Sequence, residues 1–179
     1  MSRGATVKDV PAETFINALA AHFKETAQME IPDYAEYIKT ASFKELAPYD
    51  PDWYYIRAAS IARKVYLFGG IGIGGLAKVY GGHARRGTRR GHFQRASRGV
   101  LRHALRQLGE MKLVAKKKGK KGRFITSQGQ KTLDVIAKQL VAKMPRADFY
   151  DAMPEMKEEV EDIEGEGEGE AEGEGEAEA

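Results

Sequence analysis

The sequence predicts a mainly α-helical domain of the winged helix-turn-helix type, with a central hydrophobic helix and a small β-hairpin, followed by a disordered acidic tail. Three observations lead to this prediction: apolar residues at helical spacing, a lysine-rich turn between two short β-prone runs in residues 111–126, and an abrupt change of composition near residue 146. We therefore expect one domain in residues 1–145 and the tail in residues 146–179.

The first helix is expected to begin at Asp9 or Val10, with Pro11 near its first helical position. Residues 42–45, Ser-Phe-Lys-Glu, have the form of a capping box, which predicts a short helix that ends at Pro48. Apolar residues recur at helical spacing along the first helix, so this face is predicted to be core: Phe15, Ile16, Leu19, Ala20 and Phe23.

The central helix has the clearest start in the chain. Asp50 is the expected N-cap, Pro51 the first helical residue and Asp52 part of the first turn. The helix continues through Leu67 to a glycine stop at residues 69–70. Apolar residues surround almost the whole of it, which predicts that the other elements pack on it. One edge is expected to face solvent: Arg57, Ser60, Ile61 and Lys64.

Residues 69–91 contain nine glycines and little apolar mass, which predicts a flexible basic arm. Within it, residues 70–75 match the Gly-x-Gly-x-x-Gly string of dinucleotide-binding loops. A helix rather than a strand precedes the string, and no acidic residue follows about twenty residues later, so we expect no nucleotide cofactor. The arm carries five cations: Lys78, Arg85, Arg86, Arg89 and Arg90.

A basic amphipathic helix is predicted over residues 92–108. At about 100° per residue, four arginines fall within an arc of about 80°. Only Arg106 has an acidic neighbour at helical spacing, Glu110, so the arginines repel one another unless a polyanion binds them. They are Arg95, Arg98, Arg102 and Arg106. The opposite side is predicted to be core and consists of Phe93, Val100, Leu101, Ala104 and Leu108.

A hairpin over residues 111–126 is predicted to follow, with five lysines at its tip: Lys116, Lys117, Lys118, Lys120 and Lys121. Ser127 and Gln130 then form a capping box for a last helix that ends at Pro145. The order of helix, basic helix, basic-tipped hairpin and helix predicts the winged helix-turn-helix plan. The apolar positions of the last helix are Leu133, Ile136, Ala137, Leu140, Val141 and Met144.

Charge is strongly segregated along the chain. Between Asp52 and Asp134 there are twenty Lys or Arg and a single acidic residue, Glu110. Residues 1–154 hold 28 Lys or Arg against 13 Asp or Glu, a net charge of +15, whereas residues 155–179 hold 13 acidic residues against Lys157, a net charge of −12. Clustered cations bind phosphate backbones by releasing condensed counterions, so the domain is expected to bind a nucleic acid.

Catalysis is not expected. The chain has no Cys, its four His are scattered, and the basic half offers only Glu110 as a carboxylate, so we expect neither a metal site nor an acid–base pair. No signal peptide or membrane span is apparent, which predicts a soluble intracellular protein without a membrane partner or a small-molecule substrate.

Several separated motifs agree in order and spacing with one known family: Trp53-Tyr54-Tyr55-x-Arg57-Ala58-Ala59-Ser60-x-Ala62-Arg63, Gly69-Gly70-x-Gly72, Tyr80-Gly81-Gly82, His92-Phe93 and Thr126-x-x-Gly129-Gln130. Across residues 5–143 the chain resembles the S-nineteen-e family of small-subunit ribosomal proteins of eukaryotes and archaea. The resemblance implies a winged-helix protein in the head of the small subunit that binds rRNA, lies beside other ribosomal proteins and is needed for late maturation of the precursor. It implies functional roles for four cations: Arg57, Arg63, Arg98 and Arg102.

The chain departs from the family in two places. Residues 105–109 read Leu-Arg-Gln-Leu-Gly where the family commonly has Leu-Gln-x-Leu-Glu, which adds a cation to the RNA face. The acidic tail has no counterpart in the usual family member. We hypothesise that the tail competes with nucleic acid for its own basic domain, and the alternative is a solubility tail without such a role. Comparing residues 1–154 with the full chain at low salt tests this: removing the tail should tighten binding to unrelated RNA more than binding to the cognate rRNA site. Equal affinities in both comparisons would leave only the alternative.

Charge and resemblance together predict RNA binding by these residues: Arg57, Arg63, Lys64, Lys78, Tyr80, Arg85, Arg86, Arg89, Arg90, Arg95, Arg98, Arg102, Arg106, Lys116, Lys117, Lys118, Lys120 and Lys121. The expected location is the cytoplasmic ribosome, with nucleolar assembly if the source is eukaryotic, and no homo-oligomer is expected. A winged-helix DNA-binding regulator remains the alternative, and it would read bases with its recognition helix.

Overall fold

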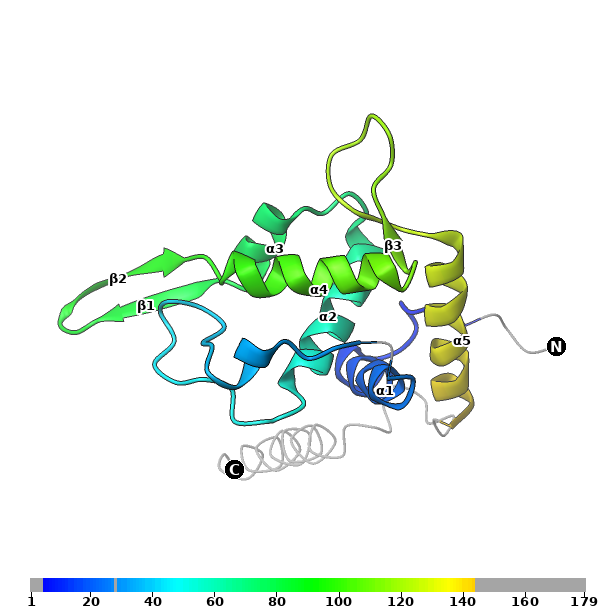
Figure 1. The fold of residues 1–179 in the computed structure, drawn as a ribbon, viewed down its shortest axis with the longest axis horizontal. Helices are drawn as coiled ribbons and strands as arrows, with labels where there is room; N and C mark the ends of the chain where they lie inside the picture. Colours follow the sequence, from blue (N-terminus) through cyan, green and yellow to red (C-terminus); the bar gives the residue numbers. More distant parts are fainter. Residues whose placement is uncertain (1–4, 28, 144–179) are drawn as a thin grey trace, which may run out of the picture. The chain divides into compact units, whose positions relative to one another are not determined.

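The computed structural model describes residues 5–27 and 29–143. Within these residues the chain is mainly helical, as predicted, and it carries two antiparallel hairpins rather than one (Figure 1). The α-helices are α1 (Ala12–Glu25), α2 (Trp53–Phe68), α3 (Ile73–Val79), α4 (Arg98–Glu110) and α5 (Ser127–Lys143), and the 3-10 helix is η1 (Asp33–Glu36). The strands are β1 (Gly82–Arg86), β2 (Arg89–Gln94), β3 (Val114–Ala115) and β4 (Phe124–Ile125). The predicted tail, together with Met144 and Pro145, lies outside the described residues.

Helix α1 begins slightly later than predicted. Pro11 is its N-cap residue, while the Asp9 carboxylate accepts hydrogen bonds from the backbone N–H and the hydroxyl of Thr6, at 2.7 and 2.9 Å. Asp9 therefore closes a turn ahead of the helix instead of starting it. The predicted apolar face is confirmed, since Phe15, Leu19 and Phe23 are buried against α2.

The short helix predicted at residues 42–45 does not form. The chain makes a turn there, in which the Lys44 N–H donates to the Ala41 carbonyl at 3.3 Å. The Ser42 hydroxyl donates to the Gln94 amide oxygen at 3.2 Å, so it is not available as a helix cap. A helix of one turn is unfavourable because nucleation fixes several backbone angles for a single hydrogen bond. The long-range hydrogen bond from Ser42 to Gln94 of β2 forms instead.

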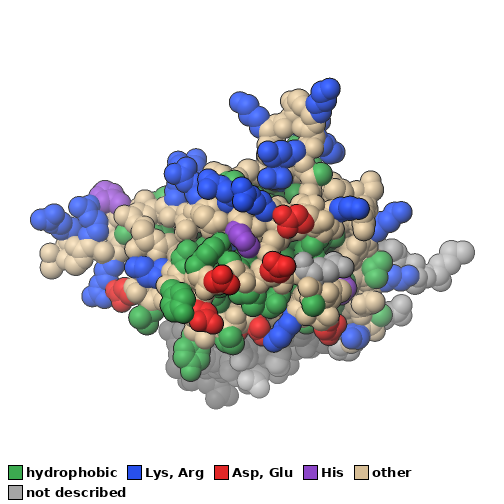
Figure 2. Space-filling model, viewed as in Figure 1, with side chains coloured by type: hydrophobic (Ala, Val, Ile, Leu, Met, Phe, Trp, Pro, Cys, Tyr) green, Lys and Arg blue, Asp and Glu red, His purple; other side chains and the backbone are tan. Residues whose placement is uncertain are grey.

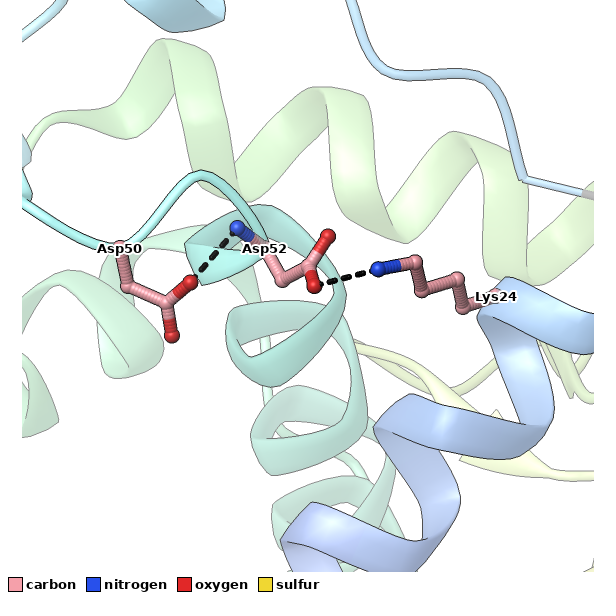
Figure 3. A network of polar contacts seen from close by, with 3 residues as sticks. All are labelled: Lys24, Asp50 and Asp52. Carbon is pink, nitrogen blue, oxygen red and sulfur yellow. Dashed lines mark hydrogen bonds and ion pairs between the residues drawn. The ribbon is translucent and has the colours of Figure 1, made fainter.

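Helix α2 is the central helix, as predicted, because it packs on α1, α4 and β4. It begins at Trp53, and the Asp50 carboxylate accepts a hydrogen bond from the Asp52 N–H at 2.8 Å in the turn that leads into it. Figure 3 shows Asp52 in turn accepting from Lys24 Nζ at 2.6 Å, which joins α1 to the start of α2. This exposed ion pair contributes little to stability.

The edge of α2 predicted to face solvent is only partly open. Ile61 is fully buried, and Arg57, Ser60 and Lys64 are half-buried. The expectation for Ile61 was wrong because α2 packs on α1, α4 and β4, and Ile61 is part of the core that they form. The predicted glycine stop is confirmed, since Gly69 and Gly70 both have positive φ, +39° and +75°.

The flexible basic arm predicted at residues 69–91 is instead α3 followed by the β1–β2 hairpin. Two adjacent residues of α3, Leu76 and Ala77, are fully buried, and α3 packs on α4. Backbone pairing then builds the hairpin, in which only Ala84 is buried. The prediction failed because it counted apolar residues, whereas backbone hydrogen bonds need none.

The β3–β4 hairpin with its connecting loop, residues 114–125, is the wing. It leads into α5, whose N-cap is Thr126 rather than the predicted Ser127: the Thr126 hydroxyl accepts from the Gly129 N–H at 2.9 Å. Gly129 lies against the Leu113 backbone, where any side chain would collide. Along α5, Leu133, Ile136 and Ala137 are buried as predicted, while Val141 is exposed.

A buried polar network joins α2, α4 and the segment that follows α1. The Tyr54 hydroxyl donates to the Gln107 amide oxygen at 2.8 Å and lies 2.6 Å from His103 Nδ1. Because the hydroxyl has one hydrogen, His103 Nδ1 is the donor in the second contact. Gln107 completes the network by donating to the Glu30 carbonyl at 2.6 Å. Burial raises the pKa of Tyr54, so its hydroxyl stays protonated.

Tyr54→Phe removes this shared hydroxyl, and we expect a loss of about 1–3 kcal/mol in the free energy of unfolding, because Gln107 and His103 each lose a partner in the interior. Urea denaturation measures the change. The matched control is Tyr49→Phe, at a fully exposed tyrosine, which should leave stability unchanged. Equal stability of the Tyr54 variant and the wild type would show that the network does not stabilise the fold.

Candidate nucleic-acid interface

Helix α4 has one core face and one cationic face. Val100, Leu101, Ala104, Leu105 and Leu108 are buried, and the arginines between them are exposed. The exposed arginines follow one another at intervals of four residues, so their guanidinium groups lie along one side of the helix. They are Arg98, Arg102 and Arg106.

Two residues of the predicted basic helix lie elsewhere. The helix was expected to begin at His92, but residues 89–94 pair with β1 as a strand and α4 begins only at Arg98. Arg95 is exposed in the link between β2 and α4, and Phe93 is an exposed strand residue rather than a core residue. The cationic face of α4 therefore has three arginines, with Arg95 preceding the helix.

The β1–β2 hairpin carries a second group of cations. Arg86 and Arg89 are paired across its end, Gly87 turns the chain with a φ of +68°, and four arginines are exposed. Lys78, on α3 just before the hairpin, is exposed as well. The hairpin arginines are Arg85, Arg86, Arg89 and Arg90.

The wing carries the third group. Its five lysines are all exposed, and Gly119 and Gly122 have positive φ, +75° and +91°, where the loop reverses. Lys117 Nζ lies 5.1 Å from the centre of the Phe124 ring. The wing lysines are Lys116, Lys117, Lys118, Lys120 and Lys121.

These three groups, on the β1–β2 hairpin, α4 and the wing, form what we call the basic face. Figure 2 shows Lys and Arg side chains over the tip of the β1–β2 hairpin, along α4 and at the tip of the wing. Among the described residues the only ion pair joins Lys24 to Asp52, so no cation of the basic face is paired with a carboxylate of this part of the chain. Glu110, at the end of α4, is the one acidic residue near these groups in the sequence. Such a surface attracts a polyanion and repels other cations.

Arg57, Lys64 and Tyr80 form a separate cluster between α2 and the end of α3. The Arg57 guanidinium lies 4.3 Å from the centre of the Tyr80 ring, Lys64 Nζ lies 5.7 Å from it, and the Tyr80 hydroxyl is 2.7 Å from Ser60 Oγ. Burial lowers the pKa of Arg57 and raises the pKa of Tyr80. The Arg57 guanidinium therefore already lies over one part of the Tyr80 ring. If an RNA base stacked on Tyr80, it would have to bind beside Arg57.

Arg63 lies half-buried on α2. Its Nε atom is buried and has no hydrogen-bond partner among the described residues. A buried donor without a partner is energetically costly.

Within the Asp52–Asp134 stretch, the sequence prediction omitted two exposed cations, Lys112 and Lys131. Lys112 precedes β3 with a φ of +57°, and Lys131 lies near the start of α5, so both flank the wing. The signal that could have identified them is the run of positive charge itself, which includes both residues.

The described part of the chain gives little support for a metal site or a membrane-spanning helix. It contains no cluster of His, Asp or Glu that could hold a metal ion. None of its helices has both the length and the hydropathy needed to cross a membrane. His103, one of the four histidines, is held by Tyr54 within the polar network.

Comparison with known proteins gives a consistent result. The family model described as "Ribosomal protein S19e" matches residues 6–143. The small ribosomal subunit protein eS19 of Oryza sativa subsp. japonica is 52% identical over 137 residues, which cover 76% of this chain and 92% of that protein. The eS19 protein of Myxine glutinosa is 49% identical over 138 residues (77% and 94%), and eS19B of Schizosaccharomyces pombe is 48% identical over 138 residues (77% and 96%).

Proposed function

Because the chain belongs to the ribosomal protein S19e family, we propose that its basic face binds the rRNA of the small ribosomal subunit. Membership confirms the resemblance found in the sequence and makes the chain a structural protein of the small subunit rather than an enzyme. The residues and RNA contacts that carry this role are our proposal.

One observation supports the proposal above all others: Arg98, Arg102 and Arg106 project from a helix whose other side is core, and no described residue forms an ion pair or hydrogen bond with them. An exposed row of fixed guanidinium groups matches phosphate oxygens, which accept charge-assisted hydrogen bonds from arginine. The hairpin tip and the wing extend the same positive surface, so one RNA segment could contact all three groups.

We further propose that the protein occupies the subunit head beside other ribosomal proteins, and that its binding supports subunit assembly and precursor maturation. Assembly in the nucleolus of a eukaryotic source, followed by function on cytoplasmic ribosomes, is part of the same proposal. Arg57 and Arg63 differ from the basic face because both are half-buried, so we assign them contacts with RNA that reaches the side of α2.

The DNA-binding alternative is not favoured by α4. A recognition helix usually reads adenine with Asn or Gln, and the one amide side chain on α4 is Gln107. Gln107 is buried and holds Tyr54 and the Glu30 carbonyl, so it cannot reach a base. The exposed arginines suit phosphate oxygens and guanine edges alike, so it is membership of the ribosomal protein family that favours rRNA over DNA.

The affinity of the full chain for small-subunit rRNA should fall by orders of magnitude between ~50 and ~200 mM salt, because each phosphate contact releases counterions. Filter binding or fluorescence anisotropy over a salt series gives the slope. A flat response would contradict the electrostatic basis of the proposal.

A further inference from the structure

The segment between α1 and α2 places its large apolar side chains on the outside. Tyr37, Leu46 and Tyr49 are 81%, 83% and 104% exposed, while two alanines of the same segment, Ala35 and Ala41, are buried. Packing alone would favour the opposite arrangement, because burying a tyrosine or leucine removes far more apolar surface from water than burying an alanine. We call residues 30–50 the aromatic loop.

The aromatic loop is fixed to the domain at several points. At its start the Glu30 carbonyl accepts from Gln107, and the Tyr34 ring packs edge-on against His103 with centroids 6.0 Å apart. In its middle the Thr40 carbonyl accepts from the Ser97 N–H at 2.9 Å. The exposed side chains are therefore presented by an anchored backbone, which reduces the entropy lost when a partner binds.

The charge of the aromatic loop is opposite to that of the basic face. Residues 30–50 contain five acidic residues and two lysines, and all five carboxylates are exposed. None forms an ion pair within the described residues. Figure 2 shows hydrophobic and acidic side chains together below α4, on the part of this face where few Lys or Arg lie. The acidic residues are Glu30, Asp33, Glu36, Glu45 and Asp50.

We propose that the aromatic loop is a docking surface for a Lys/Arg-rich protein segment that carries apolar anchors. Tyrosine is enriched at protein interfaces, and Leu46 adds an exposed apolar side chain to the same loop. The surrounding carboxylates attract cations and repel RNA phosphates, which excludes RNA as the occupant. The inference rests on the proposed function, because the partner is expected within the small subunit, where the basic face is occupied by rRNA.

Site-specific photo-cross-linking tests the proposal on assembled subunits. Leu46 is replaced by the photoreactive residue p-benzoylphenylalanine in the full chain, and subunits that contain the variant are purified on gradients, irradiated and analysed by mass spectrometry. We expect a cross-link to one basic protein segment. A cross-link to rRNA, to an acidic segment or to a second copy of this chain would overturn the proposal, and so would the absence of any cross-link.

Charge reversal provides the second readout. Glu36→Lys with Glu45→Lys should lower the cross-link yield several-fold, whereas the same change at Glu13 and Glu25, two exposed carboxylates of α1, should not. Equal yields in both variants would contradict a role for charge in docking. Failure of the proposed function looks different, because a chain that does not bind rRNA would not enter the gradient-purified subunits at all.

Discussion

Replacing Arg98 and Arg102 together by Glu should greatly weaken binding to small-subunit rRNA while leaving the fold intact. Both side chains are exposed on α4, and neither contacts another described side chain through a hydrogen bond or ion pair. The variant loses two phosphate contacts and gains two repulsive charges, so affinity should fall by orders of magnitude at low salt. The slope of log affinity against log salt should become shallower by about two.

Circular dichroism and thermal melting distinguish this outcome from misfolding, and incorporation into subunits should be lost while both remain unchanged. The matched control is Lys8→Glu with Lys138→Glu, which changes the charge equally at two exposed lysines outside the Asp52–Asp134 stretch. The control should keep most of the affinity. A marked fall in the melting temperature of the Arg98/Arg102 variant would show that the two arginines are structural.

Leu101→Ala is expected to produce the largest change in stability. Leu101 is buried on the core side of α4, and its truncation should cost about 2–5 kcal/mol because the lost methyl groups leave a cavity. Ile136→Ala on α5 should act in the same way. Since a domain is commonly stable by only about 5–15 kcal/mol, either variant should reduce the amount of folded protein.

Urea denaturation gives the loss directly, and the control Leu46→Ala, at an exposed leucine, should change stability by less than about 0.5 kcal/mol. Any defect in subunit assembly should follow the amount of folded protein. A Leu101 or Ile136 variant that remains fully folded and still fails to assemble would contradict the core assignment of that helix.

The sequence predicted the elements whose packing depends on periodicity. The apolar face of α1, the central position of α2 and the alternation of core and cation along α4 all repeat at the helical period, so side-chain type alone reveals them. The β1–β2 hairpin has no such signature. Only Ala84 is buried in it, and its arginine-rich strands are held by backbone pairing, which residue type does not encode.

Local side-chain patterns were less dependable where distant residues compete for the same groups. The Ser42 hydroxyl has the spacing of a helix cap but donates to Gln94, 52 residues away. The same limit applies to the candidate site. Exposure of Arg98 and Arg102 follows from their helical position, whereas the stacking of Arg57 on Tyr80 depends on the path of the chain through α3, which composition did not reveal.

Directed hydroxyl-radical cleavage from α4 tests the central claim most directly. Because the chain has no Cys, Gly99→Cys creates a single attachment point for an iron chelate beside Arg98, at a position where an added Cβ would meet only Ser97 Oγ, at 3.9 Å. In assembled subunits we predict strong, localised cleavage of small-subunit rRNA from position 99, and much weaker cleavage from Tyr49→Cys on the aromatic loop. Equal cleavage from the two positions, or none from position 99, would contradict the assignment of the basic face to rRNA.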